Sequence, residues 1–540
     1  MEKIFKDIQR RRIKFFGKEI SGLFTIPSGI VATEASILER IANEVPEIGI
    51  LTTKSIGIEP REGNREPIIA QYGPLSFINA VGLTNPGAEE FAERLTRTRI
   101  PDNKFLLVSI FGSCEKEFVE VAEKLRDYAD GFEVNISCPH SEKYGQAIGQ
   151  DRGLVKEIII NIVSLGKPVF VKISPNLDVK KTVKCVVESE ASGITAINTR
   201  GPELYLHNRH PVLSNKVGGV SGKAILELGL KCVREVRNIT DLPIIASGGI
   251  STAEDVKMYK GAGADFFGIG SALAGMNTQE IKEYFHNLSV DLEQGTDTVA
   301  GFLKKELNME YKKYKVDKNT QLAEDLFLLR LNNNIKIKPG QFIFAWLPEK
   351  GEKPLSVFDD EPLTLLIRKI GCFTNELSKL RKGDTVYIRG PYGNSPKTNG
   401  KVLLVGGGTG IAALYLFAKR NRKTIVVLGA GDEDHLPYIG KFKLASKELH
   451  LATENGKLGH KGLVTDKLEI IVKNTQPEYC INCGPEPMVK TAIRKESKFI
   501  KPKNIYSSIE YLTRCGIGLC GSCATSEGYR SCVDGTFMNY

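Results

Sequence analysis

The chain has 540 residues, more than one ordinary domain holds, so several separately packed units are expected. Apolar residues make up 41% and charged residues 26%, a globular balance that excludes a long disordered region. The net charge of +10 comes from lysines and arginines spread along the chain, not clustered beside aromatic residues. This pattern argues against nucleic-acid binding and favours phosphorylated cofactors and anionic substrates.

Residues 1–22 are basic but lack the apolar core of a signal peptide, and no run of about 18 apolar residues occurs. We therefore expect a soluble, cytoplasmic protein that does not bind membranes. In that setting the eleven cysteines are expected to be reduced, catalytic or metal-bound rather than paired in disulfides. Their crowding near the C-terminus favours a metal.

Residues 20 to 285 alternate short β-branched runs with helical stretches. The clearest runs are 106–111, 131–136, 168–173, 193–198, 242–246 and 266–269. This spacing over this length predicts a TIM (β/α)8 barrel within 1–290, with an open doubly wound sheet as the alternative. Polar or glycine-rich residues follow nearly every run, so the active site is expected at the carboxyl ends of the strands.

The sequence pattern changes after the barrel. Residues 291–311 are charged and predict a helical connector. Turn-broken strands predict an antiparallel β-barrel over 312–398, and the strands are expected at 325–331, 340–347, 363–370 and 384–388. A strand, a glycine loop and a helix then predict an α/β nucleotide-binding domain over 399–500. A small cysteine-rich domain over 501–540 completes this multidomain α/β chain.

Four cysteines near the C-terminus have the C-x4-C-x2-C spacing of plant-type ferredoxins, followed by a distal fourth: Cys515, Cys520, Cys523 and Cys532. Soft thiolates suit iron, and glycines between them allow tight turns. Zinc is the alternative, although it usually takes two C-x2-C-like pairs. The spacing therefore predicts a 2Fe-2S cluster. Only eight residues separate Cys523 from Cys532, so the fourth ligand is expected on a short hairpin.

A strand ending at Val405 enters a glycine loop whose amides can hold a pyrophosphate, with an ordinary tight turn as the alternative. Together with Lys353-Pro354-Leu355-Ser356 and Cys483-Gly484-Pro485, this loop resembles the ferredoxin reductase family. The resemblance implies FAD at Lys353, Pro354, Leu355, Ser356, Gly371 and Thr374. It implies NAD at Gly406, Gly407, Gly408, Thr409, Gly410, Cys483, Gly484 and Pro485. Lys353 stands where that family often has arginine, which weakens bidentate phosphate binding.

Two glycine-rich strand ends in the barrel, Gly248-Gly249-Ile250 and Gly268-Ile269-Gly270-Ser271, can aim amides at one phosphate, as FMN would need. Asn135-Ile136-Ser137-Cys138-Pro139 directly follows another strand. With Thr53-Lys54-Ser55, residues 78–85, Val171-Lys172 and residues 218–222, these motifs resemble dihydroorotate dehydrogenase of the cysteine-base class. The resemblance covers residues 20–275.

The resemblance implies that Cys138 takes a proton from C5 of dihydroorotate while hydride leaves C6 for N5 of FMN. Lys54 would raise the thiolate fraction of Cys138, and Lys172 would neutralise the reduced flavin. The implied substrate residues are Lys54, Asn79, Gly82, Leu83, Asn135, His140, Asn198 and Thr199. The implied FMN residues are Ser28, Gly29, Lys54, Lys172, Gly222, Gly248, Gly249, Gly270 and Ser271. His140 replaces an asparagine that is common in the family. Taken singly, each asparagine is more often a turn or cap residue, and a cysteine such as Cys138 is more often a core residue.

Bacterial NAD-linked dihydroorotate dehydrogenases resemble this chain twice, with one subunit like the barrel and another like residues 312–540. The resemblance implies oxidation of dihydroorotate to orotate in de novo pyrimidine biosynthesis, with electrons passing from FMN through 2Fe-2S and FAD to NAD. It also implies a homodimer formed through the barrel. Two other interpretations stay open: another pyrimidine or dihydropyrimidine oxidoreductase, and an electron-transfer flavoprotein serving a protein partner. The choice between NAD and NADP is also open.

Overall fold

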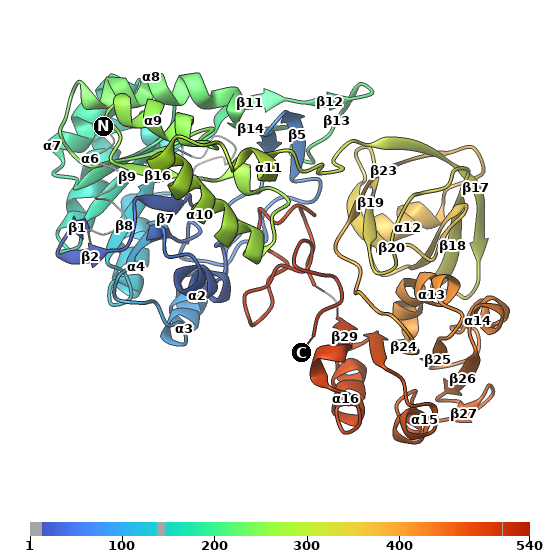
Figure 1. Ribbon diagram of the computed structural model, residues 1–540. Coiled ribbons are helices and arrows are strands. Elements are labelled where there is room, and N and C mark those ends of the chain that lie inside the picture. The colour runs from blue at the N-terminus through green and yellow to red at the C-terminus, as the bar shows by residue number, and fades with distance from the viewer. Residues whose placement is uncertain (1–12, 138–145, 510, 540) are drawn as a thin grey trace. The chain divides into compact units, whose positions relative to one another are not determined.

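The computed structural model describes residues 13–137, 146–509 and 511–539 (Figure 1). The chain divides into two compact units. The first contains residues 1–307 and 517–530, and the second contains residues 308–516 and 531–540. The division into five domains expected from the sequence is finer than this and stays a prediction.

Eight parallel strands close into a barrel in the first unit. In barrel order they are β10 (Gly193–Ala196), β15 (Ile244–Ser247), β16 (Phe266–Gly268), β3 (Phe24–Ile26), β4 (Ile48–Thr52), β7 (Phe105–Ile110), β8 (Gly131–Asn135) and β9 (Val169–Ile173). Every residue of these strands is buried, as in parallel barrels that helices cover. The predicted barrel is confirmed, and its closure rules out the open doubly wound sheet.

Helices follow the barrel strands along the chain and surround them (Figure 1). They are α2 (Ala35–Glu44), α3 (Ala88–Thr96), α4 (Glu115–Leu125), α5 (Gln146–Gln150), α6 (Arg152–Val163), α7 (Val179–Glu188), α8 (Leu226–Arg237), α9 (Ala253–Gly261) and α10 (Thr278–Gln294). The helices pack on the strands through apolar faces. In α4, for example, Phe118, Val121, Ala122 and Leu125 are buried along one face at helical spacing. Capping side chains fix where several helices begin. At the start of α7, for example, the Asp178 carboxylate accepts a hydrogen bond from the Lys181 amide.

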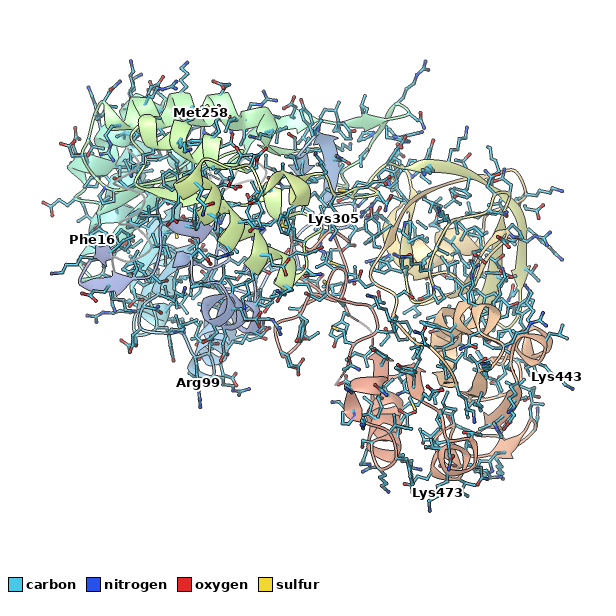
Figure 2. The ribbon with its side chains drawn as sticks, in the orientation of Figure 1. Phe16, Arg99, Met258, Lys305, Lys443 and Lys473 are labelled. Carbon is cyan, nitrogen blue, oxygen red and sulfur yellow. The ribbon has the colours of Figure 1, made fainter. Side chains whose placement is uncertain are left out.

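An aromatic cluster fills the amino-terminal end of the barrel. The hairpin of β1 (Ile13–Phe15) and β2 (Lys18–Ile20) places the Phe15 ring 4.8 Å from that of Phe105 and 4.7 Å from that of Phe266. Both partners stand at the first residue of their strands. Phe16, in the hairpin turn, is 43% exposed (Figure 2). The packed end leaves the carboxyl ends of the strands as the place for a site.

A four-stranded antiparallel sheet is built from the loops at the carboxyl end. Its order is β11 (Arg200–Leu204), β14 (Val217–Gly222), β6 (Ser76–Asn79) and β5 (Ile69–Gly73). Gly219 and Asn79 are register partners in it. A second small pair is formed by β12 (Leu206–His207) and β13 (His210–Pro211). The sheet thereby brings residues distant in sequence to the same end of the barrel.

Residues 517–530 pack with the first unit through main-chain and side-chain hydrogen bonds. The Val31 amide donates to the Leu519 carbonyl at 2.7 Å, and the Thr33 hydroxyl donates to the Cys520 carbonyl at 3.0 Å. The Gly275 amide donates to the Ile517 carbonyl at 2.8 Å. These bonds fix the loop that carries Cys520 and Cys523 against the barrel.

The connector expected over 291–311 is less helical than predicted. α10 ends at Gln294, and the one further helix described there is the four-residue α11 (Ala300–Leu303). Asp291 accounts for the break, because its carboxylate accepts hydrogen bonds from Thr296, Thr298 and Val299. This carboxylate holds the chain in a turn and ends the helix.

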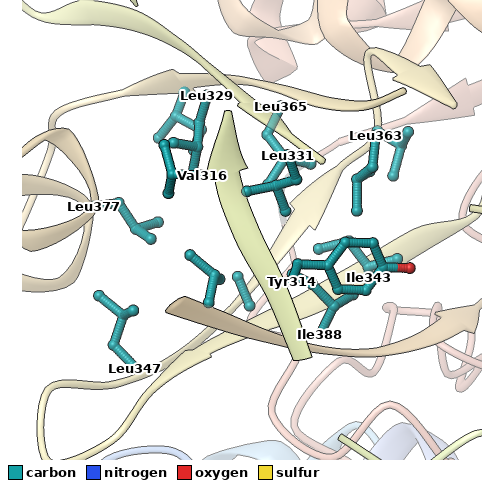
Figure 3. Packing of buried hydrophobic residues seen from close by; sticks show 14 of the residues in the cluster. Tyr314, Val316, Leu329, Leu331, Ile343, Leu347, Leu363, Leu365, Leu377 and Ile388 are labelled. Atoms are coloured by element: carbon teal, nitrogen blue, oxygen red, sulfur yellow. The ribbon is translucent and has the colours of Figure 1, made fainter. Parts of the chain in front are cut away.

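The second unit begins with a seven-stranded antiparallel sheet. In order its strands are β20 (Gly351–Ser356), β19 (Phe342–Leu347), β23 (Thr385–Tyr392), β17 (Lys312–Gln321), β18 (Leu326–Leu331), β22 (Leu363–Arg368) and β21 (Asp359–Asp360). Side chains from β17, β18, β19, β22 and β23 meet in one buried cluster with Leu377 of α12 (Cys372–Ser378), as Figure 3 shows. The antiparallel strands and the single core agree with the prediction. The sheet has β20 and β21 at its two ends, and the predicted antiparallel barrel stays a prediction.

The rest of the second unit is a six-stranded parallel sheet. Its order is β27 (His460–Lys461), β26 (Glu448–Thr453), β25 (Ile425–Ala430), β24 (Val402–Gly407), β28 (Tyr479–Cys483) and β29 (Ile505–Ser508). The accompanying helices are α13 (Ile411–Arg420), α14 (Ile439–Ala445), α15 (Leu468–Thr475) and α16 (Glu486–Glu496). The strand order reverses between β24 and β28, so a ligand crevice is expected at their carboxyl ends.

Candidate active site in the barrel and candidate cofactor sites

A pocket opens at the carboxyl ends of the barrel strands. It has about 1100 Å³ of empty volume, part of it open to solvent. Among its lining residues are Ser28, Gly29, Lys54, Asn79, Gly82, Leu83, Asn135, Lys172, Asn198, Thr199, Gly222, Gly248, Gly249, Gly270 and Ser271. These are all the described residues that the sequence assigns to FMN or substrate. Cys138 and His140 lie outside the described residues. The roles of the individual side chains stay predictions.

Two glycines in the pocket wall cannot be replaced without moving backbone. At Gly222, where φ is +85°, an added Cβ would lie 2.0 Å from the Leu75 carbonyl oxygen. At Gly249, where φ is +80°, it would lie 2.8 Å from the Gly222 carbonyl oxygen. Both positions need the freedom and the small size of glycine. Leu83 also has a positive φ, 55°, which is uncommon for a side chain of its kind and occurs at binding sites.

A chain of hydrogen bonds fixes the polar side chains of the pocket. The Asn135 amide donates to the Ser55 hydroxyl at 2.9 Å, and the Ser137 hydroxyl donates to Asn135 Oδ1 at 2.8 Å. The Asn198 amide in turn donates to the Ser137 hydroxyl at 2.7 Å, and Ser28 and Ser55 share a bond of 3.1 Å. The network sets which face each asparagine presents. Ser55 and Ser137 lie within the sequence motifs, but no motif indicated this role.

The pocket contains two buried lysines. Lys172 Nζ lies 3.7 Å from Glu133 Oε1, and the two side chains are 6% and 2% exposed. Glu133 also accepts a hydrogen bond from the Ser109 hydroxyl at 3.0 Å. Lys54 is buried as well. Burial raises the pKa of nearby Glu34, and the charges of Arg94 and Lys54 oppose that rise. Two buried ammonium groups suit an anionic ligand.

Glu133 is a site residue that sequence reasoning missed. It stands two positions before Asn135 in β8, so both side chains lie on the same face of the strand. A charged residue in a fully buried strand is uncommon unless it is paired. A glutamate inside a buried strand was therefore the sequence signal that could have identified Glu133.

The two predicted NAD motifs meet in the second unit. Gly406 of β24 is the register partner of Cys483 of β28. An added Cβ on Gly410 would lie 2.4 Å from the Cys483 carbonyl oxygen, so the loops approach at backbone distance. A neighbouring pocket of about 620 Å³ is lined by Gly408, Thr409 and the end of β25, among other residues. The contact matches the crevice expected where the strand order reverses.

A histidine that no motif indicated lines the same pocket. His435 Nδ1 lies 2.6 Å from Asp432 Oδ1, and His435 Nε2 lies 2.9 Å from Asp325 Oδ1. The hydrogen bond to Asp325 is the main cause that raises the pKa of His435, and the hydrogen bond to Asp432 is the second. Arg368 Nε also donates to Asp325, at 2.5 Å. The cluster links β18 and β22 to the loop after β25.

The two predicted FAD segments are neighbours. Lys353, Pro354, Leu355 and Ser356 belong to the edge strand β20, which lies beside α12. Gly371 precedes that helix, and its amide donates to the Thr374 hydroxyl at 3.1 Å. The structure thus brings the predicted FAD residues of the two motifs to one edge of the sheet.

All four predicted cluster ligands are buried: Cys515, Cys520, Cys523 and Cys532. Gly516 and Gly521 between them have φ values of +80° and +68°, as tight turns require. Among the described residues, no group of three or more histidine, cysteine or acidic side chains is arranged to hold a metal ion. The thiol donors suit iron, and the 2Fe-2S cluster stays a prediction.

None of the helices described is both long and apolar enough to cross a membrane.

Comparisons with known proteins concern mainly the first half of the chain. A family model described as dihydroorotate dehydrogenase matches residues 11–289. The dihydroorotate dehydrogenase B (NAD(+)) catalytic subunit of Methanocaldococcus jannaschii is 38% identical over 297 residues, which are 54% of this chain and 92% of that protein. The same subunit of Pyrococcus horikoshii is 39% identical over 267 residues, 48% of this chain and 86% of that protein. A chain from the solved structure of an NADH-dependent reduced ferredoxin-NADP oxidoreductase is 32% identical over 42% of this chain and 87% of its own length. Its TM-score is 0.38, too low to support a conclusion about this fold.

Proposed function

Because the chain belongs to the dihydroorotate dehydrogenase family, we propose that its barrel oxidises dihydroorotate to orotate and that its second unit delivers the electrons to NAD. The observation that carries the proposal is the barrel pocket. The residues expected to hold FMN or substrate come from parts of the chain as far apart as Ser28 and Ser271. They nevertheless line one pocket at the carboxyl ends of the strands.

The glycine-rich strand ends fit FMN. Gly222 and Gly249 line the pocket where a Cβ would collide with neighbouring main chain. We assign the phosphate to the loops at Gly248, Gly249, Gly270 and Ser271, the usual phosphate position in such barrels. FMN bound there supplies the hydride acceptor. Lys172, buried beside Glu133, would supply the positive charge that a reduced flavin needs.

The asparagines and Lys54 fit a small cyclic amide with a carboxylate. Asn79, Asn135 and Asn198 present amide groups to the pocket, and the serine network holds two of them in a fixed orientation. Such groups can pair with both donors and acceptors of a pyrimidine ring. Lys54 would hold the carboxylate. Cys138, outside the described residues, would take the C5 proton as general base.

The second unit fits an electron-transfer role. We assign FAD to β20 and the start of α12, and NAD to the crevice formed by the loops after β24 and β28. The four buried cysteines would hold the 2Fe-2S cluster. A cluster carries one electron at a time, whereas a flavin can exchange one electron or two. The two flavins would therefore link hydride transfer at the substrate and at NAD to single-electron transfer through the cluster. Acting as one protein, both units would serve pyrimidine biosynthesis.

The direct test is anaerobic turnover. Purified protein supplied with dihydroorotate and NAD should form orotate and NADH. Cys138→Ala should abolish orotate formation but keep NADH-to-dye activity, because the dye takes electrons from the second unit. Cys114→Ala removes an exposed thiol of the same barrel and should leave both activities intact.

Failure of the wild type to oxidise dihydroorotate would overturn the substrate assignment. Turnover of dihydrouracil in its place would favour another pyrimidine oxidoreductase. Binding of FMN without bleaching by either compound would favour an electron-transfer protein that serves a partner.

A further inference from the structure

A buried ion pair in the second unit has no role in the sites described so far. Arg389 of β23 and Glu352 of β20 have side chains that are 1% and 0% exposed. Two parallel hydrogen bonds join them, from Arg389 Nε to Oε1 at 2.6 Å and from Nη2 to Oε2 at 2.7 Å. The Tyr311 hydroxyl donates to the same carboxylate at 2.7 Å. The guanidinium is therefore held in one orientation.

The remaining nitrogen of that guanidinium is directed to the cysteine segment. Arg389 Nη1 donates to the Cys515 carbonyl at 3.0 Å and to the Tyr392 hydroxyl at 2.9 Å. The guanidinium also lies 4.0 Å from the centre of the Phe344 ring. An added Cβ on Gly516 would lie 2.8 Å from Phe344, so residues 515 and 516 pack directly on the sheet. A fixed cation thus holds the main chain of Cys515.

The other end of the network is next to the predicted FAD strand segment. Glu352 directly precedes Lys353, the first residue of the FAD motif in β20. One continuous set of hydrogen bonds therefore runs from the backbone of Cys515 through Arg389 to β20. A buried ion pair generally adds no more stability than well-packed apolar residues of the same volume, so stability alone does not explain it.

We propose that Arg389 is a positioning residue for electron transfer: with Glu352 it fixes Cys515, as a cluster ligand, in place against the strand that holds FAD. This inference rests on the proposed function. The pair is neutral as a whole, so its effect is on position rather than on the charge around the cluster. Donor and acceptor groups held in a set geometry exchange electrons or atoms far better than loosely held ones.

The test replaces both partners together, because removing one would leave an unpaired buried charge. Arg389→Met with Glu352→Leu keeps the volume apolar and removes the hydrogen bond to Cys515. Tyr392→Phe is a milder variant that removes one acceptor of the guanidinium. Lys419→Met is the matched control, because Lys419 is paired with Asp359 and Asp360 and is bonded to none of the cysteines in the described chain.

The measurements are FAD and iron content per chain, the electron paramagnetic resonance spectrum of the reduced cluster, and its rate of reduction by NADH. In the double variant we expect normal FAD content and normal NADH-to-ferricyanide activity. Cluster reduction should slow by about tenfold or more, with a broadened spectrum. Tyr392→Phe should slow it less, and Lys419→Met should match the wild type.

An unchanged rate and spectrum in the folded double variant would overturn the inference. So would a parallel fall of FAD, iron and ferricyanide activity, since that result indicates a structural role alone. If the double variant does not fold, an unchanged rate and spectrum in Tyr392→Phe overturns the inference in the same way. Wild-type protein without iron would overturn the cluster assignment itself. That result is distinguishable, because orotate formation with a dye as acceptor would persist.

Discussion

Alanine in place of Gly222 is predicted to destabilise the barrel and to weaken FMN binding. Gly222 has φ of 85° and ψ of −156°, a region that residues with a side chain almost never occupy. The new methyl group would lie 2.0 Å from the Leu75 carbonyl oxygen. That oxygen cannot move freely, because it accepts a hydrogen bond from the Lys223 amide at 3.1 Å. The strand end must therefore shift.

The magnitude follows from two separate costs. The backbone conformation costs about 1–3 kcal/mol for a residue other than glycine. Forcing a methyl group into occupied space costs about 1–3 kcal/mol more. Together they predict a loss of about 2–6 kcal/mol in the free energy of unfolding of the barrel. Because Gly222 lines the pocket, the shift should also displace the wall that we propose holds FMN.

Two other glycines separate these costs. At Gly29, φ is +82° but no atom lies within 4 Å of an added Cβ, so alanine should cost only about 1–2 kcal/mol of strain. At Gly261, the last residue of α9, the space is also open and φ is not in the left-handed region. Alanine there should stabilise the helix by about 0.5–1 kcal/mol.

Calorimetry of the barrel transition in protein stripped of FMN, followed by FMN titration, would measure the series. The order of the three variants is the test, because a chain of two units need not unfold in one step. The reasoning would be refuted if Gly222→Ala unfolded at the same temperature as Gly29→Ala and bound FMN like the wild type.

Three further predictions concern charges and thiols. Lys172→Met should lower the free energy of unfolding by about 3–5 kcal/mol, because Glu133 stays buried without its cation. Adding Glu133→Gln should restore most of this loss. Equal instability of the single and double variants in calorimetry would contradict the ion pair. Because hydrogen bonds raise the pKa of His435, its link to Asp325 is strongest below the ordinary histidine pKa and is lost as pH rises through the raised value. Asp325→Asn should lower that pKa in an NMR titration, and an unchanged curve would count against the link. Cys520→Ser should lower iron per chain while NADH-to-dye activity persists, and iron equal to the wild type would exclude Cys520 as a ligand.

Periodicity predicted the barrel because six of its eight strands, such as β7, coincide with short apolar runs that alternate with helical stretches. β3 and β4 were not among the predicted runs, and short runs of this kind carry little periodic signal. The pocket was predictable for a topological reason. Carboxyl ends of parallel strands meet at one end of a barrel, so residues that follow strands must converge there. That is why Gly249 could be assigned to a phosphate site without contact information, whereas the family resemblance implied the roles of Lys54 and Asn135.

Features that depend on tertiary contacts escaped the sequence analysis. Glu133, His435 and Arg389 have partners 39, 110 and 126 residues away, and no local motif marks them. The order of the seven strands, with β20 and β21 at its ends, depends on strand pairing, which turn signals do not determine. The break after α10 depends on one carboxylate, Asp291, which accepts four hydrogen bonds from amides and hydroxyls of Thr296, Thr298 and Val299.

The most direct test of the proposed function is to mix the purified protein with dihydroorotate and NAD without oxygen and to measure orotate and NADH together. We predict equal amounts of the two products, with FMN, cluster and FAD absorbance all bleached by dihydroorotate when NAD is left out. Orotate formation without NADH, or bleaching of FMN alone, would contradict an electron path through the second unit. No orotate at all would contradict the activity assigned to the barrel.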